Sequence, residues 1–328
     1  MSVYVSDANG NLTQYAGLIK GGDITPNIIK EIYGENLLQN SHLTVNQRNV
    51  KLNQTATMYM ADRWYKSCTN QVKVNLLPSG QPAGTFEFRF LKTLTEPIRV
   101  LEQRIDIASC YQNRPIVVSW TISSSTTEAD NSACMGLEYF DETGASLGVK
   151  TAQAYIEGNV YFKDTIPDTA TSMTFFFQLN TPAIRTRLIR LINPKVEFGT
   201  AVSKFGGRIE EQEPDICQKY YYTTGVSSEK YITLKAISAT EFEPSVIFLP
   251  TQMVKEPTIT LFGTDGTSNT LECIESGGAS ITVSGVPLLD GFRCFKVTAT
   301  NAVVGNHYKL GGYTADAETL PLNVNITE

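Results

Sequence analysis

Residues 187–222 read RLIRLINPKVEFGTAVSKFGGRIEEQEPDICQKYYY, and this stretch separates two parts of the chain that share a β-rich pattern. Leu188–Ile192 is apolar and β-branched, which predicts a buried strand, the last of the first part. Gly206 and Gly207 interrupt that pattern. The stretch therefore predicts a strand that ends one domain, followed by a glycine hinge.

The second half of the stretch predicts a short helix. Glu210–Asp215 concentrates acidic residues, as is typical of a first helical turn, and Pro214 suits the first helical position. Ile216 and Tyr220 are four residues apart and would share one face of a helix. We expect this Ile/Tyr face to dock the helix at the start of a second domain.

On both sides of the stretch, apolar and polar residues alternate as they do in half-buried strands. Phe86–Phe90 and Ile116–Ile122 are examples before it, and Thr258–Phe262 is one after it. Turn residues separate these runs, and no long helical period intervenes. The fold class expected is all-β, with two tandem antiparallel β-sandwiches, the first of jelly-roll type, joined by a short helix. The expected divisions are an N-terminal segment 1–35, a first sandwich 36–206, a hinge and helix 207–222, and a second sandwich 223–328.

The N-terminal segment differs from the rest of the chain. Val3–Val5 and Leu12–Tyr15 flank a run of turn residues, which predicts a hairpin. Thr25–Tyr33 begins with Thr-Pro and predicts a short helix. A hairpin with one helix is too small to be stable alone, so it must pack on the body or on another chain. It is either an attachment segment or a flap that covers the first sandwich.

Bulk composition excludes several classes of partner. The net charge is −6 and no basic run occurs, which argues against a nucleic-acid partner. No apolar run reaches the length of a membrane span, so we expect no membrane insertion. Met1–Tyr4 opens without the features of a signal peptide, and we expect synthesis in the cytoplasm. The six cysteines are widely spaced with no Cys-x-x-Cys pair, and we expect free thiols.

The sequence gives little support for histidine-based catalysis. His42 and His307 are the only histidines, and neither has a second metal-ligating residue at a suitable spacing. Phosphate-loop and zinc-protease motifs do not occur. We expect no enzyme activity, no cofactor and no metal site. A glycosidase that needs only two carboxylates stays a less favoured alternative, because the chain has 33 acidic residues.

The aromatic residues are more informative, because flat rings stack on the apolar faces of sugars. The favoured candidates are His307, Tyr308 and Tyr313, which lie among Gly305, Gly311 and Gly312 in a region that reads as loop. Trp64 and Tyr65 are the next candidates for a ligand-binding surface. Trp64 has a second interpretation, in which it fills the sandwich core, and we favour that one because large aromatic residues are mostly buried.

Several motifs, taken in their order along the chain, resemble a family of tail fibre and tail-associated proteins of tailed bacteriophages. They are Asn36–Asn40, Asn46–Arg48, Ala61–Trp64, Gln103–Asp106, Lys195–Gly199, Cys217–Tyr221 and, more loosely, Gly311–Glu318. The resemblance implies a jelly-roll module like those that bind carbohydrates, in a virion part that is often trimeric.

The function expected from this resemblance is that of a non-enzymatic virion protein. It would be a tail fibre or receptor-binding component that binds other phage tail proteins through residues 1–35 and a host surface glycan through its sandwiches. A structural connector or baseplate subunit that binds only phage proteins is the alternative. A glycan-cleaving tailspike is less favoured, because the long repeats of such spikes are missing.

Overall fold

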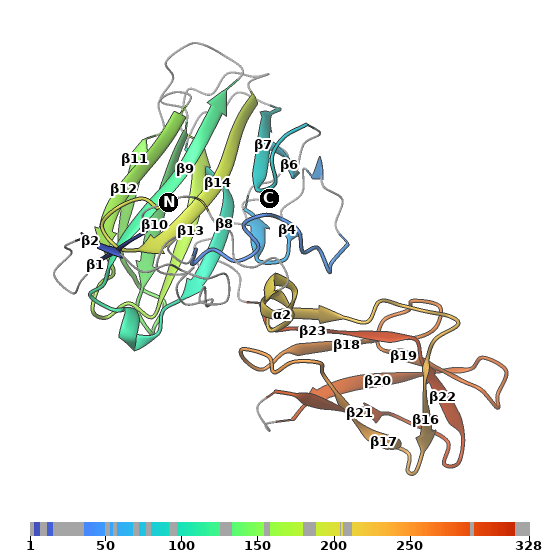
Figure 1. The fold of residues 1–328 in the computed structure, drawn as a ribbon. Coiled ribbons are helices and arrows are strands. Elements are labelled where there is room, and N and C mark those ends of the chain that lie inside the picture. The colour runs from blue at the N-terminus through green and yellow to red at the C-terminus, as the bar shows by residue number, and fades with distance from the viewer. Residues whose placement is uncertain are drawn as a thin grey trace.

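The computed structural model shows an all-β protein, with one short α-helix among the residues that it describes (Figure 1). Strands β1 (Val3–Ser6) and β2 (Leu12–Tyr15) pair antiparallel, which confirms the predicted hairpin. The helix predicted at 25–33 lies outside the described residues. The structure describes residues 3–6, 12–15, 36–49, 53–54, 58–67, 72–76, 80–91, 97–124, 133–153, 158–179, 188–203, 205, 212–288 and 292–318.

Two six-stranded antiparallel sheets form the first sandwich. One sheet has the order β11-β10-β13-β8-β5-β4. Its strands are β4 (Met58–Ala61), β5 (Trp64–Lys66), β8 (Ile98–Asp106), β10 (Ala133–Phe140), β11 (Ser146–Gln153) and β13 (Ser172–Leu179). The other has the order β12-β9-β14-β7-β6-β3. Its strands are β3 (Asn53–Gln54), β6 (Val72–Leu76), β7 (Thr85–Phe90), β9 (Pro115–Ser124), β12 (Gly158–Thr165) and β14 (Leu188–Phe198).

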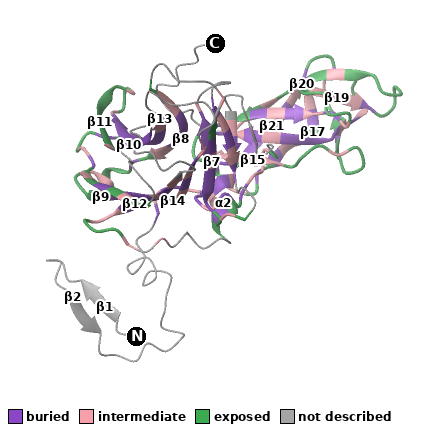
Figure 2. Cartoon of the chain, turned by 90° about the horizontal axis from the view of Figure 1, so that it is seen from above, coloured by how far each residue is buried: buried purple, intermediate pink, exposed green. Residues whose placement is uncertain are grey.

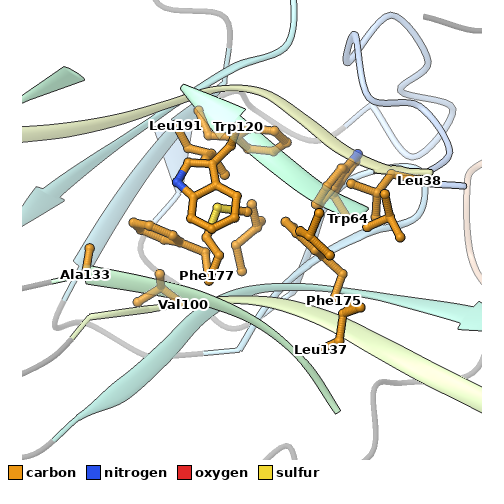
Figure 3. Packing of buried hydrophobic residues seen from close by; sticks show 14 of the residues in the cluster. Leu38, Trp64, Val100, Trp120, Ala133, Leu137, Phe175, Phe177 and Leu191 are labelled. Carbon is orange, nitrogen blue, oxygen red and sulfur yellow. The ribbon is translucent and has the colours of Figure 1, made fainter. Parts of the chain in front are cut away.

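The core between the two sheets is aromatic. Phe88 and Phe177 stack with ring centroids 4.5 Å apart, and Trp64 meets Phe86 edge-on at 4.7 Å. Trp64, Trp120, Phe175 and Phe177 are part of this core (Figure 3). Both faces of β10 and β13 are buried for most of their length, whereas β11 is exposed (Figure 2). Strand β6 shows the alternation expected for a sandwich, because every second residue, Val72, Val74 and Leu76, is buried in this core.

Strand β14 contains the apolar run that opens the dividing stretch, and its burial confirms the prediction. It lies in the interior of its sheet, between β7 and β9. Leu188–Ile192 pairs with β7, and the register against β9 shifts between Ile192 and Lys195. This irregularity places Asn193 in the left-handed region, at φ 55°. A bulge of this kind bends a strand and redirects its side chains.

The short helix, α2 (Glu213–Gln218), falls within the predicted region, with Pro214 in its first turn. Its docking face is not the predicted one. Glu213 and Cys217 are its buried residues, whereas Ile216 is only partly buried. A polar contact explains why this face is buried: a carboxylate oxygen of Glu213 accepts a 2.8 Å hydrogen bond from the backbone N–H of Asn40. A buried partner of this kind overrides the apolar periodicity.

The C-terminal half is also all-β, in agreement with the predicted class, but its strands close on themselves. A barrel has the order β16-β17-β21-β20-β19-β22, and a three-stranded sheet β15-β23-β18 accompanies it. Closure follows from β22, which pairs with both β16 and β19. The bounds are β15 (Tyr221–Thr223), β16 (Ile232–Ala236), β17 (Glu241–Phe248), β18 (Thr258–Phe262), β19 (Thr270–Cys273), β20 (Ser280–Pro287), β21 (Cys294–Ala299), β22 (His307–Leu310) and β23 (Gly312–Asp316).

A buried arginine joins the two halves. Arg63, in the turn between β4 and β5, forms an ion pair with Glu318 just beyond β23, and both side chains are almost fully buried. Its guanidinium donates to the Gln39 side chain at 2.7 Å and to the Arg104 carbonyl at 2.6 Å, and lies 3.6 Å from the centre of the Tyr220 ring. The Arg63 guanidinium is therefore stabilised by an ion pair, by hydrogen bonds and by a cation–π contact.

A second arginine repeats this arrangement nearby. Arg48 forms a 3.0 Å ion pair with Asp316 and lies 3.7 Å from the centre of the Tyr221 ring and 4.3 Å from that of Tyr59. Its other terminal nitrogen is 3.9 Å from Glu318. We call Arg48, Arg63, Asp316 and Glu318 the clamp. Burial raises the pKa of Glu318, and the positive charges of Arg63 and Arg48 oppose that rise.

The clamp predicts a large difference between buried and exposed ion pairs. Arg63→Met should lower the free energy of unfolding by about 3–5 kcal/mol, because Glu318 loses its closest cationic partner while it stays buried. Lys296→Met, which breaks a pair with the half-exposed Glu241, should cost less than about 1 kcal/mol. Urea denaturation of the full chain measures both. Adding Glu318→Gln to Arg63→Met should recover part of the loss; equal effects of the two single substitutions would contradict a buried clamp.

Candidate functional site

The structure places two of the favoured site residues in the C-terminal core. Tyr308 is 1% exposed and Tyr313 is 5% exposed. The Tyr308 hydroxyl accepts a 2.9 Å hydrogen bond from the Val303 backbone, and the Tyr313 ring packs edge-on against Phe295 at 4.9 Å. Their rings are packing surfaces in this structure, so they present no face on which a sugar could stack. Burial also raises the pKa of Tyr313 to about 12.

His307 differs from these two tyrosines, because its side chain is partly exposed. Its Nδ1 lies 2.6 Å from a carboxylate oxygen of Glu275, and its backbone N–H donates to the other oxygen at 2.8 Å. These bonds lower the pKa of Glu275 to about 2. The His307–Glu275 contact lies at the surface, and a ligand-binding role for His307 stays a prediction.

Of the three glycines expected to form an open loop here, only Gly305 lies in an exposed turn, with φ at 89°. Gly311 and Gly312 lie at the junction of β22 and β23, and both are buried. A Cβ atom at Gly312 would lie 1.8 Å from the Gly225 carbonyl oxygen, and one at Gly311 would lie 2.6 Å from that of Gly263. Glycine is required here for close backbone packing within the fold, which is the opposite of an open approach to a ligand.

Trp64 and Tyr65 are also buried, at 0% and 6% exposure. The Trp64 indole donates a 2.9 Å hydrogen bond to the Asn40 carbonyl, and its ring lies in the aromatic core (Figure 3). This placement agrees with the core interpretation of Trp64. Tyr65 packs edge-on against Tyr59 at 5.1 Å, next to the clamp. Neither ring face is available at the surface.

The outer face of the sheet β12-β9-β14-β7-β6-β3 carries a groove of about 430 Å³. Residues of β9 and β12 and of the bulge in β14 line it, together with the segment that follows β14. The lining residues are Ser119, Trp120, Thr121, Asn159, Val160, Tyr161, Asn193, Val202, Ser203 and Phe205. None of these ten was singled out from the sequence as a ligand-binding residue.

Register explains why the groove is hollow. On the outer face of β9, Ser119 and Thr121 have short side chains, and their partners on β12 are Tyr161 and Asn159. Small residues therefore form a low floor beside a taller wall. Tyr161 is 57% exposed, although it is a large aromatic residue. Tyr161 therefore forms one wall of the groove and exposes much of its ring to solvent.

The opposite wall is the segment that follows β14, and a buried ion pair holds it in place. Lys195 Nζ lies 2.9 Å from Glu197, and both side chains are 1% exposed. The Ser203 backbone N–H donates to Glu197 at 2.8 Å and its hydroxyl donates at 2.5 Å, while Lys195 also contacts this hydroxyl. Ser203 is therefore tied to β14, and it positions Val202 at the rim of the groove. Burial lowers the pKa of Lys195, and the bond to Glu197 opposes that effect.

The groove lining contains two side-chain amides, those of Asn159 and Asn193, and a hydrogen bond orients the first of them. The Thr121 hydroxyl donates to the Asn159 side-chain oxygen at 2.6 Å. With that oxygen engaged, the amino group of Asn159 is the part that can donate to a ligand. The groove therefore offers hydroxyl groups, amide groups and one exposed ring. This is the chemistry of polyol recognition.

Two buried carboxylates of the first sandwich lie together on the other sheet, away from the groove. Glu102 and Glu138, both nearly fully buried, share Arg99, whose Nη1 is 3.6 Å from Glu102 and 2.6 Å from Glu138. Arg99 also lies 3.9 Å from the centre of the Phe176 ring. Burial is the main cause that raises the pKa of Glu102 to about 7, and Glu138 adds to the rise while Arg99 opposes it. Among the described residues, no group of three or more His, Cys, Asp or Glu is placed to hold a metal ion, and no helix is long and apolar enough to cross a membrane.

The Glu102 pKa predicts how stability depends on pH. Glu102 ionises near its ordinary pKa of 4.5 in the unfolded chain but only near pH 7 in the folded one. Between these pH values the folded chain therefore binds one proton that the unfolded chain has lost. Its contribution to the free energy of unfolding is full below about pH 4.5 and is lost as the pH rises through about 7, by on the order of 3 kcal/mol.

Glu102→Gln removes this titration, so its denaturation midpoint should fall less than that of the wild type between about pH 4.5 and about pH 8. Glu142→Gln, at an exposed turn, controls for the loss of one negative charge. A wild-type slope in Glu102→Gln would show that other groups cause the pH dependence.

No family model matches the sequence, and the search of curated proteins finds no match. Among solved structures, the chain is similar to the enzymatically active domain of tailspike protein 4 of bacteriophage CBA120, with 12% identity and a TM-score of 0.33 over 50% of this chain and 21% of that chain. The CBM22-1 xylan-binding domain from Paenibacillus barcinonensis matches with 10% identity and a TM-score of 0.32 over 52% of this chain and 97% of its own. An arabinose-bound α-L-arabinofuranosidase matches with 16% identity and a TM-score of 0.36 over 58% of this chain and 30% of its own.

This chain therefore spans about a fifth of the length of the tailspike domain that it matches. At these identities and TM-scores, the similarities do not identify a ligand or an activity for this chain.

Proposed function

We propose that this protein is a non-enzymatic glycan-recognition protein that binds a sugar unit in the groove over β9 and β12. The observation that carries the proposal is the exposed ring of Tyr161, which stands beside a floor of short hydroxyl side chains. Sugars present apolar C–H faces and hydroxyl edges, so a ring wall and a polar floor complement both.

The groove is well placed for this role because rigid elements hold it. Ser119 and Thr121 lie on an interior strand of the sheet, and Ser203 is fixed by the buried Lys195–Glu197 pair. A preformed site loses little conformational entropy when it binds. A shallow site of this kind gives modest affinity per copy, which several copies on one particle would raise by avidity.

The sequence resemblance supports a finer proposal about context. We propose that the chain is a virion component of a tailed bacteriophage, made in the host cytoplasm. Residues 1–35 would contact other phage tail proteins, three copies would form a trimer, and the groove would bind a host surface glycan. A connector that binds only phage proteins is the alternative, and it requires no sugar affinity.

Tyr161→Ala should weaken glycan binding by about tenfold or more, because the stacking wall is lost, which corresponds to about 1.4 kcal/mol. Its melting temperature should stay close to that of the wild type, since the side chain is already 57% exposed. Tyr231→Ala, at a 41% exposed tyrosine of the C-terminal half, is the matched control and should bind as the wild type does. A glycan array followed by calorimetry on the hits measures both, and a chain that binds no glycan would favour the connector.

Deleting residues 1–34 tests the proposed attachment role. The truncated chain should keep glycan affinity, because the groove lies in residues 119–205, but it should fail to enter virions. Incorporation measured by mass spectrometry of purified particles gives the result. Truncated chain found in particles at the wild-type level would show that attachment lies elsewhere.

A further inference from the structure

We infer that the groove selects an uncharged sugar that carries an acetamido group, an N-acetylhexosamine unit. The inference rests on the proposed glycan binding and adds the chemical class of the sugar. Three properties of the lining support it, namely its lack of charge, its pair of side-chain amides and its apolar rim.

The first property is electrical neutrality. None of the ten described lining residues carries a charged side chain. Lys195 and Glu197, on β14 next to the groove, are bonded to each other and are 1% exposed, so they compensate each other. A carboxylate, sulfate or phosphate on a ligand would lose hydration here and gain no cationic partner among the described lining residues. The lining therefore disfavours acidic sugars.

The second property is the pair of side-chain amides. Asn159 stands on β12 and is exposed, with its oxygen held by the Thr121 hydroxyl at 2.6 Å. Its amino group is left to meet an acceptor, and an amide carbonyl is a stronger acceptor than a sugar hydroxyl. Asn193 lines the groove from the β14 bulge, where its backbone N–H donates to the Gly84 carbonyl at 3.2 Å. Its side chain can both donate and accept, which suits the N–H and C=O of an acetamido group.

The third property is an apolar rim. Val202 is 45% exposed and Phe205 is half-buried, and both line the wall opposite Tyr161's strand. The Lys195–Glu197–Ser203 bonds hold this wall against β14. A methyl group that reached this wall would leave water, whereas a hydroxyl group there would lose hydrogen bonds. The acetamido group is the common sugar substituent that places a methyl next to an amide.

The test uses two tetrasaccharides that differ at one substituent per ring. Chitotetraose carries acetamido groups at the positions where cellotetraose carries hydroxyl groups. Calorimetry with the full chain should show that chitotetraose binds at least about tenfold more tightly, a discrimination typical of a small group in a matching pocket. Equal affinities, or tighter binding of cellotetraose, would overturn the inference.

Two variants connect the preference to the wall and to the amide. Val202→Ser should reduce the ratio of the two affinities several-fold while the affinity for cellotetraose stays the same, and Val226→Ser, at a valine 48% exposed in the C-terminal half, should leave the ratio unchanged. Asn159→Ala should also reduce the ratio. Unchanged ratios in both groove variants would overturn the inference. Failure of both tetrasaccharides to bind, alongside array hits that depend on Tyr161, would overturn the acetamido preference and leave glycan binding intact, whereas a chain with no array hit would overturn both.

Discussion

The fold depends on the burial of a single positive charge, that of Arg63. This residue sits in a tight turn with φ at 72°, a conformation that costs a non-glycine residue on the order of 1–3 kcal/mol. Its guanidinium is almost fully buried, so it must be met by a carboxylate and by hydrogen-bond acceptors. The carboxylate comes from Glu318, 255 positions away in the sequence. The charge is therefore compensated only when both halves of the chain have folded and met.

Motifs that are scattered along the sequence converge on this junction. The Asn40 carbonyl accepts a hydrogen bond from the Trp64 indole N–H, and the Asn40 backbone N–H donates one to the Glu213 side chain of α2. The Gln47 side chain donates to the Tyr221 carbonyl at 2.9 Å. The resemblance to phage tail proteins was based on these same segments, and in this structure they form a connection between domains. They describe how the two halves are joined, and the groove lies on other residues.

Charge is distributed unevenly over the first sandwich. Two of its buried carboxylates, Glu102 and Glu138, share Arg99, and a third, Glu197, is paired with Lys195, whereas the described lining of the groove holds no charged side chain. A glycosidase of the two-carboxylate type needs both acids beside the scissile bond. The groove instead offers hydroxyls, amides and a ring, which can hold a sugar through hydrogen bonds and stacking. Its geometry is maintained by β14, whose Val196 N–H and Pro194 carbonyl both bond to the Asn36 side chain.

The sequence alone determined the fold class, because period-two alternation such as that of Phe86–Phe90 reports a half-buried strand whatever its partners are. It also located the dividing strand and α2, since apolar runs and acidic first turns are local signals. The sites could not be found in this way. Tyr308 and Tyr313 read as loop residues beside glycines, but β22 and β23 bury them and use Gly311 and Gly312 for close packing. Tyr161 and Ser119 become neighbours only through the register of β12 against β9, which is set by the sheet as a whole. Local propensity decides which segments are strands, whereas exposure depends on which face each strand turns to its neighbours, and only the assembled sheets decide that.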